Sequence, residues 1–332
     1  HKEAFSLQAE VWRAQHKAPW RIWSKHRWDM LEPSEEPPRG SGPPFVELHA
    51  MQGERRGAVF NLTNSTEKDA DVPLRVVGLP GGKNPPWIRL YEVLFVGTRH
   101  FTAVASALRE ARRSGGDHVV HVPAGMTRQV WLSVRPEGIQ PGLHEGAVQV
   151  FPEDERPLIV PVRTKIYPLR FPDRPALRLS GWSYTNLERL HALTPENRPR
   201  LIEHLQGSYV SAPWASGVAL GNGAYDAAGT LVRKPDTKNF DDWVALWPDA
   251  PLYLVYKAVG HDFEGSKSGT AEFRTKVGNW ARFWARHVQE IGLSPDRLGV
   301  LLVDEPGTTE QFRLIAAWAR AIKSAAPGLV IW

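Results

Sequence analysis

The stretch Arg297-Leu-Gly-Val-Leu-Leu-Val-Asp-Glu-Pro-Gly307 decides the fold of the C-terminal half of this 332-residue chain. Its apolar run, residues 298–303, is typical of a strand that is buried on both faces of a parallel sheet. Asp304 and Glu305 follow the run directly, and Pro306-Gly307 ends the strand. Because α/β barrels keep their chemistry at the carboxyl ends of their strands, this carboxylate pair is the first candidate for a functional site.

Strand and helix patterns alternate around this stretch. Strands are predicted near residues 176–182, 208–214, 252–257 and 298–303, and a fifth begins at Leu329. Helices are predicted from the capping sequence at Thr194 to about Gly207, over residues 273–291, and after the capping box Thr308-Thr-Glu-Gln311. Residues 173–332 therefore predict the first five strands of a (β/α)₈ TIM barrel. A complete barrel takes roughly 250 residues, so we expect the chain to be a fragment that holds the first half.

Residues 1–172 show a different pattern of apolar and polar residues. Residues 45–172 contain short alternating segments punctuated by Pro and Gly, which predicts an all-β domain of the β-sandwich type. Residues 1–44 are expected to form a separate N-terminal segment or linker. They end in the run Pro37-Pro-Arg-Gly-Ser-Gly-Pro-Pro44, which we expect to be extended and poorly packed. The predicted organisation is thus a segment, a sandwich domain and a partial barrel.

Composition excludes several classes of function. No apolar stretch approaches the ~18–20 residues needed to span a membrane. The net charge of +5 comes from basic residues scattered among acidic ones, which does not favour nucleic-acid binding. The chain has no cysteine, and no His or carboxylate cluster has the spacing of metal ligands, so we expect no metal or other cofactor. The absence of cysteine suits an exported bacterial protein as well as a cytoplasmic one. The sequence does not indicate an oligomeric state.

Aromatic and polar residues lie at the ends of the predicted strands. They are Trp182 and Tyr184 after the first strand, Trp214 after the second, and Tyr256, Lys257 and His261 after the third. Barrel strand ends surround one opening, and aromatic rings beside carboxylates suit a sugar, so these six are the candidate substrate-binding residues. Each also has a structural interpretation. Asp304 could cap the next helix, Glu305 could pair with a cation, and the tryptophans could belong to the core.

The motif Asp304-Glu305-Pro306, with a sandwich before it and a barrel around it, resembles glycoside hydrolase family 123 and related bacterial proteins. The segments 130–134, 141–150 and 158–162 resemble the end of that family's N-terminal domain. The likeness extends over residues 45–332 by pattern. It implies a secreted β-N-acetylhexosaminidase, extracellular or periplasmic, that favours N-acetylgalactosamine.

The resemblance also implies a role for each carboxylate. Glu305 would be the general acid and then the base, and Asp304 would orient the 2-acetamido group that attacks the anomeric carbon. Two alternatives stay open. One is a retaining glycosidase whose separate carboxylate nucleophile lies on the other half of the barrel. The other is a non-catalytic carbohydrate-binding protein on a degenerate barrel.

Overall fold

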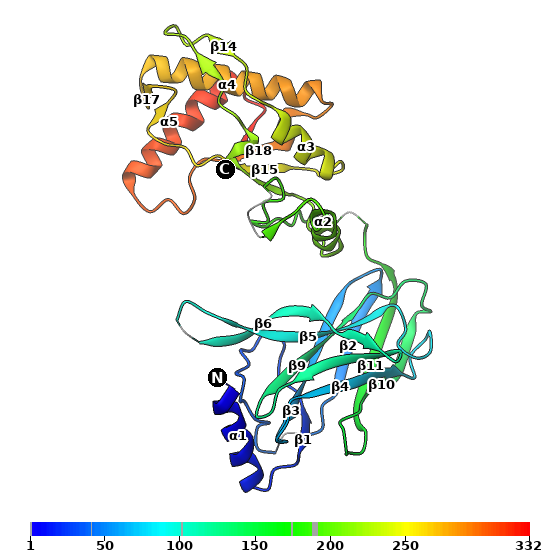
Figure 1. Cartoon of the computed structure of the whole chain (residues 1–332). Helices are drawn as coiled ribbons and strands as arrows, with labels where there is room; N and C mark the ends of the chain where they lie inside the picture. Colours follow the sequence, from blue (N-terminus) through cyan, green and yellow to red (C-terminus); the bar gives the residue numbers. More distant parts are fainter. Residues whose placement is uncertain (1, 41, 101, 174, 188–191) are drawn as a thin grey trace. The chain divides into compact units, whose positions relative to one another are not determined.

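The computed structural model describes residues 2–40, 42–100, 102–173, 175–187 and 192–332. The chain is mixed α/β with more strand than helix, and it divides into two compact units, His1–Asp173 and Arg174–Trp332 (Figure 1). We call them unit 1 and unit 2 and describe each by itself.

Unit 1 contains two sheets. The first has the order β1 (Trp20–Trp23), β3 (Arg56–Asn64), β9 (Thr127–Val134), β5 (Ile88–Gly97) and β6 (Ala103–Glu110). The second has the order β2 (Val46–Gln52), β11 (Leu158–Arg170), β10 (Gly142–Val150), β4 (Ala70–Val77), β8 (Asp117–Val122) and β7 (Arg112–Ser114). Neighbouring strands are antiparallel in both sheets, except that β2 and β11 run parallel.

One hydrophobic core joins the inner faces of these sheets. In β4, Val72, Leu74 and Val76 are buried while the residues between them are partly exposed, as the period of two requires of a half-buried strand. Leu62 of β3 and Leu132 of β9 enter the same core from the first sheet. The alternating patterns that predict strands in residues 45–172 therefore mark real strands.

The prediction that residues 1–44 form a segment separate from the β-rich domain is wrong for most of those residues. Helix α1 (Lys2–Ala14) and strand β1 belong to unit 1, since Trp12 and Trp23 are almost fully buried and β1 pairs with β3. The indole of Trp23 donates a hydrogen bond to Thr63 Oγ1 at 2.9 Å. A Cβ at Gly125 would lie 1.8 Å from the carbonyl oxygen of Phe5, so only glycine fits under α1. The apolar content of the segment decides its packing, while Pro38–Gly40, Gly42 and Pro43 stay exposed.

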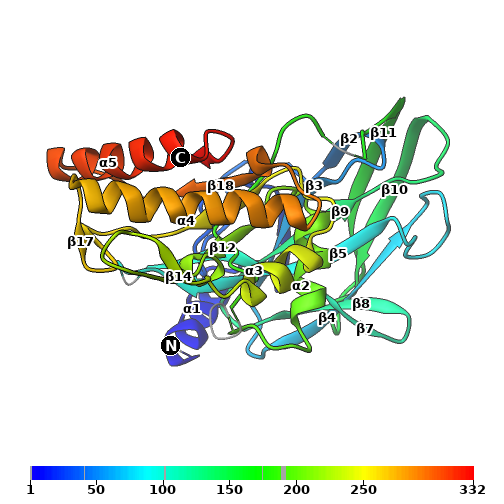
Figure 2. The same cartoon turned by 90° about the horizontal axis from the view of Figure 1, so that it is seen from above.

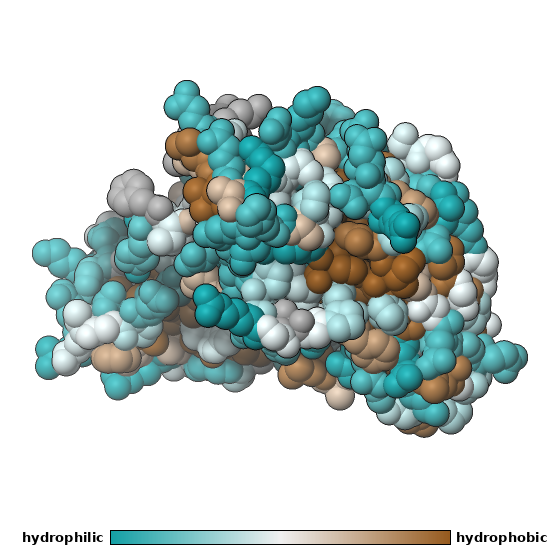
Figure 3. All heavy atoms as spheres, turned by 90° about the horizontal axis from the view of Figure 1, so that it is seen from below, coloured by the Kyte–Doolittle hydropathy of each residue, from teal (hydrophilic) through white to brown (hydrophobic). Residues whose placement is uncertain are grey.

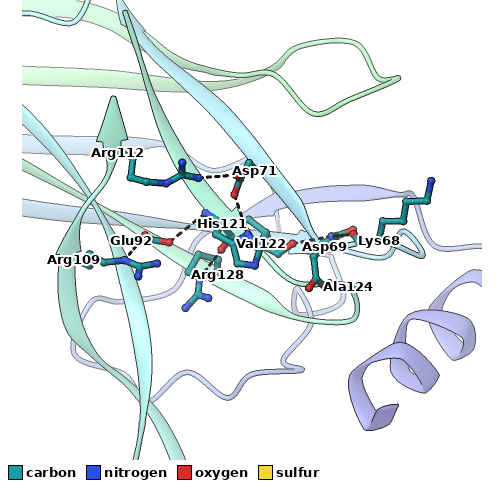
Figure 4. Close-up of polar contacts among 11 residues, drawn as sticks. Lys68, Asp69, Asp71, Glu92, Arg109, Arg112, His121, Val122, Ala124 and Arg128 are labelled. Carbon is teal, nitrogen blue, oxygen red and sulfur yellow. Dashed lines mark hydrogen bonds and ion pairs between the residues drawn. The ribbon is translucent and has the colours of Figure 1, made fainter. Parts of the chain in front are cut away.

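Charged side chains from both sheets of unit 1 meet at one edge (Figure 4). The cluster comprises Asp71, Glu92, Arg109, Arg112, His121 and Arg128. Glu92 is only 1% exposed, and it accepts hydrogen bonds from Arg109 Nε at 2.6 Å and from the backbone N–H of His121 at 3.2 Å. Hydrogen bonds from Arg112 and then His121 lower the pKa of Asp71. The cluster connects β5 and β6 of one sheet with β4, β7 and β8 of the other.

Unit 2 is built on a curled, parallel, four-stranded sheet. Its order is β12 (Trp214–Ser216), β15 (Tyr253–Tyr256), β18 (Leu298–Leu301) and β19 (Val330–Ile331). The helices are α2 (Arg198–Gly207), α3 (Lys238–Leu246), α4 (Ala271–Glu290) and α5 (Thr309–Ala325). Two small hairpins are made by β13 (Ala224–Tyr225) with β14 (Leu231–Arg233), and by β16 (Asp262–Phe263) with β17 (Ser266–Lys267).

One face of this sheet packs against the helices. Tyr253, Val255 and Val300 share a buried cluster with Trp280 and Trp284 of α4. Helices α4 and α5 lie side by side in both views (Figures 1 and 2). At their contact a Cβ on Gly278 would lie 3.2 Å from the Cβ of Ala325, so glycine allows the close approach.

Two predicted elements of unit 2 differ in the structure. Residues 176–182 form no regular strand in their described part, and only isolated bridges join Leu179 to Val210 and Tyr184 to Trp214. The α2 helix begins at Arg198 with Asn197 at the N-cap, because Thr194 and Asn197 hydrogen-bond each other in a turn before it. By contrast, the predicted capping box at Thr308 is confirmed at the start of α5.

The face seen in Figure 3 is mainly hydrophilic, with a larger hydrophobic patch and smaller hydrophobic spots elsewhere on it. No helix in the described ranges is long and apolar enough to cross a membrane.

Replacing His118 of β8 should make unit 1 less sensitive to acid. His118 is fully buried, and burial, followed by the charge of Arg113, lowers its pKa from 6.5 to about 4. The unfolded chain binds a proton at His118 more readily than the folded state does. The unfolding free energy of wild type should therefore fall by about 3 kcal/mol as the pH falls from 6.5 towards 4. The His118→Leu variant should lack this loss in urea unfolding at a series of pH values. The exposed-site variant His49→Leu should keep it, and identical profiles for His118→Leu and wild type would contradict the prediction.

Replacing Glu92 should weaken the contact between the two sheets of unit 1. The Glu92→Gln variant removes the charge that faces Arg109 and Arg128, so unfolding free energy should fall by about 2 kcal/mol. The matched control is Glu137→Gln, whose partner Arg135 lies 3.2 Å away in a pair with half-exposed side chains. Its effect should stay below about 0.5 kcal/mol. Equal effects of the two variants in urea unfolding would rule out a special role for the buried carboxylate.

Candidate functional site

The second face of the parallel sheet carries its own side chains. Trp214 and Leu254 are buried there, with Tyr256 and Leu301 partly buried beside them. Along β15 the residues alternate, so Tyr253 and Val255 face the helices while Leu254 and Tyr256 face the other way.

Three tryptophans stack on this second face. The ring centroids of Trp182 and Trp214 lie 4.6 Å apart at an interplanar angle of 25°, and those of Trp214 and Trp332 lie 5.7 Å apart at 28°. Strands β12 and β19 are the two edges of the sheet and would be ~14 Å apart in a flat one. The stack can form because the sheet curls around this face.

Tyrosines flank the stack. The rings of Tyr184 and Tyr256 meet Trp182 edge-on at 5.8 and 5.5 Å. Trp214 is 4% exposed and acts as core packing, while Trp182 and Trp332 are 44% and 62% exposed. The structure thus brings together four of the predicted substrate-binding residues, and two indoles leave a large part of their surface accessible.

Buried polar residues fix the segment that carries Trp182 and Tyr184. Thr185 Oγ1 accepts hydrogen bonds from the indoles of Trp243 and Trp247 at 3.1 and 3.0 Å. Asn186 Oδ1 accepts the backbone N–H of Ser216 at 3.0 Å. These bonds attach the segment to α3 and to the end of β12, and they replace the strand that the sequence predicts there.

The carboxylate pair lies just beyond the end of β18. The strand stops at Leu301, and Asp304 and Glu305 are both exposed in the bend that follows. Glu305 has a φ of 45°, in the left-handed region, which breaks the alternation of a strand at the pair. Helix α5 is capped by Thr308, so Asp304 is not its cap. Neither carboxylate has a hydrogen-bond or ion-pair partner within the described ranges.

Electrostatics connects Asp304 to the aromatic residues. Burial, and then the charges of Tyr256 and Asp304, raise the pKa of the Tyr184 phenol. Asp304 therefore lies near enough to Tyr184 to affect its ionisation. The chemistry available on this face combines exposed aromatic surface, two phenols and a carboxylate.

Lys257 and His261 lie apart from this group. Lys257 is the next residue after Tyr256 and points to the opposite face, where its amine donates to the carbonyl oxygen of Leu220 and lies 5.8 Å from the Trp280 ring. His261 is exposed and lies 3.3 Å from the carboxylate of Glu310 on α5. The prediction that all strand-end residues share one opening did not take the alternation at Tyr256-Lys257 into account.

Sequence reasoning missed Trp332 and the two anchoring residues Thr185 and Asn186. Trp332 follows a predicted strand and is the residue type that stacks with Trp182 and Trp214, which is a signal that could have identified it. No such signal marks Thr185 and Asn186, because their partners come from distant segments. In the part of the chain that the structure describes, no group of three or more His, Asp or Glu side chains could hold a metal ion.

Comparison with known proteins gives a fold likeness alone. No protein-family model matches the sequence, and no curated protein matches it. Among solved structures, the chain is similar to a family 123 glycoside hydrolase from Clostridium perfringens, studied for glycolipid glycan hydrolysis, with a TM-score of 0.59 and 12% identity. A GH5 xyloglucanase from Bacteroides ovatus matches over 86% of this chain and 61% of its own, at 11% identity and a TM-score of only 0.29.

The family 123 match covers 84% of this chain and 57% of the enzyme, so the chain spans little more than half the length of that protein. The chain therefore has a glycoside hydrolase-like fold.

Replacing Glu305 by glycine should relieve backbone strain. A left-handed conformation costs a residue with a Cβ roughly 1–2 kcal/mol, while glycine costs about 0.5–1 kcal/mol in lost chain entropy. The Glu305→Gly variant should therefore be as stable as wild type or more stable by up to about 1 kcal/mol, measured by urea unfolding of unit 2. The control variant Glu310→Gly, in the first turn of α5, should lower the unfolding free energy, because glycine disfavours the helix. A loss of stability at Glu305 as large as that at Glu310 would disprove the strain.

Proposed function

We propose that the chain forms part of a glycosidase, with a β-sandwich domain followed by the first half of a (β/α)₈ barrel. The observation that carries the proposal is the exposed indole surface of Trp182 and Trp332 on one face of the parallel sheet, with Asp304 in the bend just beyond β18 of that sheet. Aromatic faces bind the C–H surfaces of sugars, and a carboxylate binds their hydroxyls or donates a proton. The fold likeness to a family 123 glycoside hydrolase supports the same function.

We further propose that the substrate is a glycan ending in a β-linked N-acetylhexosamine, with N-acetylgalactosamine favoured. In this mechanism the acetamide carbonyl oxygen of the substrate attacks its own anomeric carbon, and Asp304 orients that acetamide. Glu305 protonates the leaving oxygen and then activates the water that opens the oxazolinium ring. Adjacent residues can act on one sugar only if the backbone departs from strand geometry, and the left-handed Glu305 is such a departure.

Within this proposal each aromatic residue has a role. Trp182 and Trp332 contribute stacking surface, Trp214 holds them in position, and Tyr184 and Tyr256 lie beside the sugar. Lys257 and His261 are outside the sugar site, because one faces the helices and the other pairs with Glu310. Secretion to the periplasm or the cell exterior would suit such a substrate.

The test is hydrolysis of p-nitrophenyl β-N-acetylgalactosaminide and β-N-acetylglucosaminide by the full-length protein. Wild type should cleave one of them, and Glu305→Gln should reduce kcat by about 10²-fold or more. Asp304→Asn should reduce it as well, because the amide cannot stabilise the oxazolinium charge. The control is Glu310→Gln, a nearby exposed carboxylate outside the proposed chemistry.

Other outcomes separate the alternatives. A thiazoline analogue of the oxazolinium should inhibit the substrate-assisted enzyme strongly, since it resembles the intermediate. Hydrolysis without such inhibition would indicate a separate carboxylate nucleophile. Sugar binding that survives Glu305→Gln, with no hydrolysis by wild type, would indicate a carbohydrate-binding protein and overturn the catalytic proposal.

A further inference from the structure

A second cavity of unit 2 lies on the helix side of Tyr256, away from the tryptophan stack. It has a volume of about 590 Å³ and begins beside the ends of β12 and β15. Its lining comprises Gly217, Val218, Gly221, Asn222, Gly223, Arg233, Lys234, Asp236 and Lys257. Three of its charged residues are cationic and one is anionic.

Glycines allow the backbone segments that line this cavity to pack closely together. A Cβ on Gly217 would lie 3.0 Å from the carbonyl oxygens of Tyr256 and Lys257, and one on Gly223 would lie 2.7 Å from that of Arg233. Gly223 also has a φ of 81°, in the region that disfavours other residues. The walls are therefore backbone, and a ligand can approach it closely.

The amine of Lys257 has no anion of its own. Within the described ranges, no carboxylate lies at ion-pair distance from it, and its polar partner is the carbonyl oxygen of Leu220. Burial lowers its pKa from 10.5 to about 8, although the more distant Glu264 acts in the opposite direction. A buried cation without a counter-ion is unfavourable, and a bound anion would remove that cost.

The rest of the lining extends the positive charge. Arg233 and Lys234 are exposed at the rim and have no ion pair among the described residues. Asp236 is the lone carboxylate in the lining, and its Oδ1 accepts the backbone N–H of Lys238 at 2.9 Å. The amide Nδ2 of Asn222, also in the lining, donates a hydrogen bond to Glu264 Oε1 at 2.9 Å.

We propose that this cavity binds a sulfate-type oxyanion, with Lys257 as its main cation and Arg233 and Lys234 at the rim. Charge-assisted hydrogen bonds from an ammonium to an oxyanion are among the stronger polar contacts in proteins. The anion is either free in solution or carried by a sugar. The inference does not depend on the glycosidase proposal.

Calorimetric titration of the whole chain at constant ionic strength tests this proposal. The probes are inorganic sulfate, N-acetylglucosamine 6-sulfate and, as the neutral match, N-acetylglucosamine. We expect at least one sulfated probe to bind saturably in this cavity. We expect the neutral sugar not to bind there. Binding of both sulfated probes with equal affinity identifies a free-anion site, while preference for the sugar sulfate identifies an acidic glycan.

The variants are Lys257→Met, which keeps the apolar stem, and Lys238→Met, an exposed lysine that pairs with Asp242. Lys257→Met should weaken sulfate binding about tenfold or more, and Lys238→Met should leave it unchanged. Lys257→Met should also be at least as stable as wild type without ligand, which shows that any loss of binding is not a loss of folding.

Wild-type binding should weaken as the pH rises through 8, because Lys257 then loses its proton. The other charged groups that face it are Glu264, Asp236, Arg233 and Lys234. Absence of saturable binding of either sulfated probe, or equal binding by Lys257→Met and wild type, would overturn the proposal.

Discussion

The alternation of side chains along β15 is the constraint on which unit 2 depends. Tyr253 and Val255 enter the core beneath α4 and α5, whereas Leu254 and Tyr256 face the tryptophan stack. Lys257 continues the alternation past the end of the strand and so reaches the helix side, into a cavity of its own. A single strand thereby supplies the tryptophan face with a phenol and the cavity beside Lys257 with a cation. A shift of one residue in its register would exchange the two sets.

Curvature of the parallel sheet determines which aromatic rings meet on the tryptophan face. Trp182, Trp214 and Trp332 come from segments far apart in the sequence, and their rings stack because the sheet bends around them. Trp214 is buried in the middle and its indole donates to Ser180 Oγ at 3.0 Å, so it fixes the position of the outer two rings. Rigid aromatic surface held in this way loses little entropy on binding a flat ligand.

Both units place charged side chains in largely apolar surroundings, but the charges are paired in unit 1 and one is unpaired in unit 2. In unit 1, Glu92 and Arg128 are almost fully buried and their charges are met by partners across the two sheets, which stabilises one arrangement of the strands. In unit 2, Lys257 is partly buried beside a carbonyl and an aromatic ring and lacks a carboxylate partner in the described ranges. A paired charge is typical of structure, whereas an unpaired one beside a cavity is typical of a binding site. Glu305 adds a second unfavourable feature, a strained backbone, at the proposed catalytic pair.

The sequence by itself determined the elements whose signals are local. Period-two alternation identified the strands of unit 1, the Thr308 capping box fixed the start of α5, and the apolar run before Asp304 identified β18. Tertiary structure decided the rest. Residues 176–182 have the composition of a strand, yet Thr185 and Asn186 hold that segment through partners at Trp243, Trp247 and Ser216 that no local pattern reveals. The N-terminal segment is packed because distant strands offer it a surface. Which strand-end residues meet depends on sheet curvature and on the face each side chain takes, and both arise only when the strands pair.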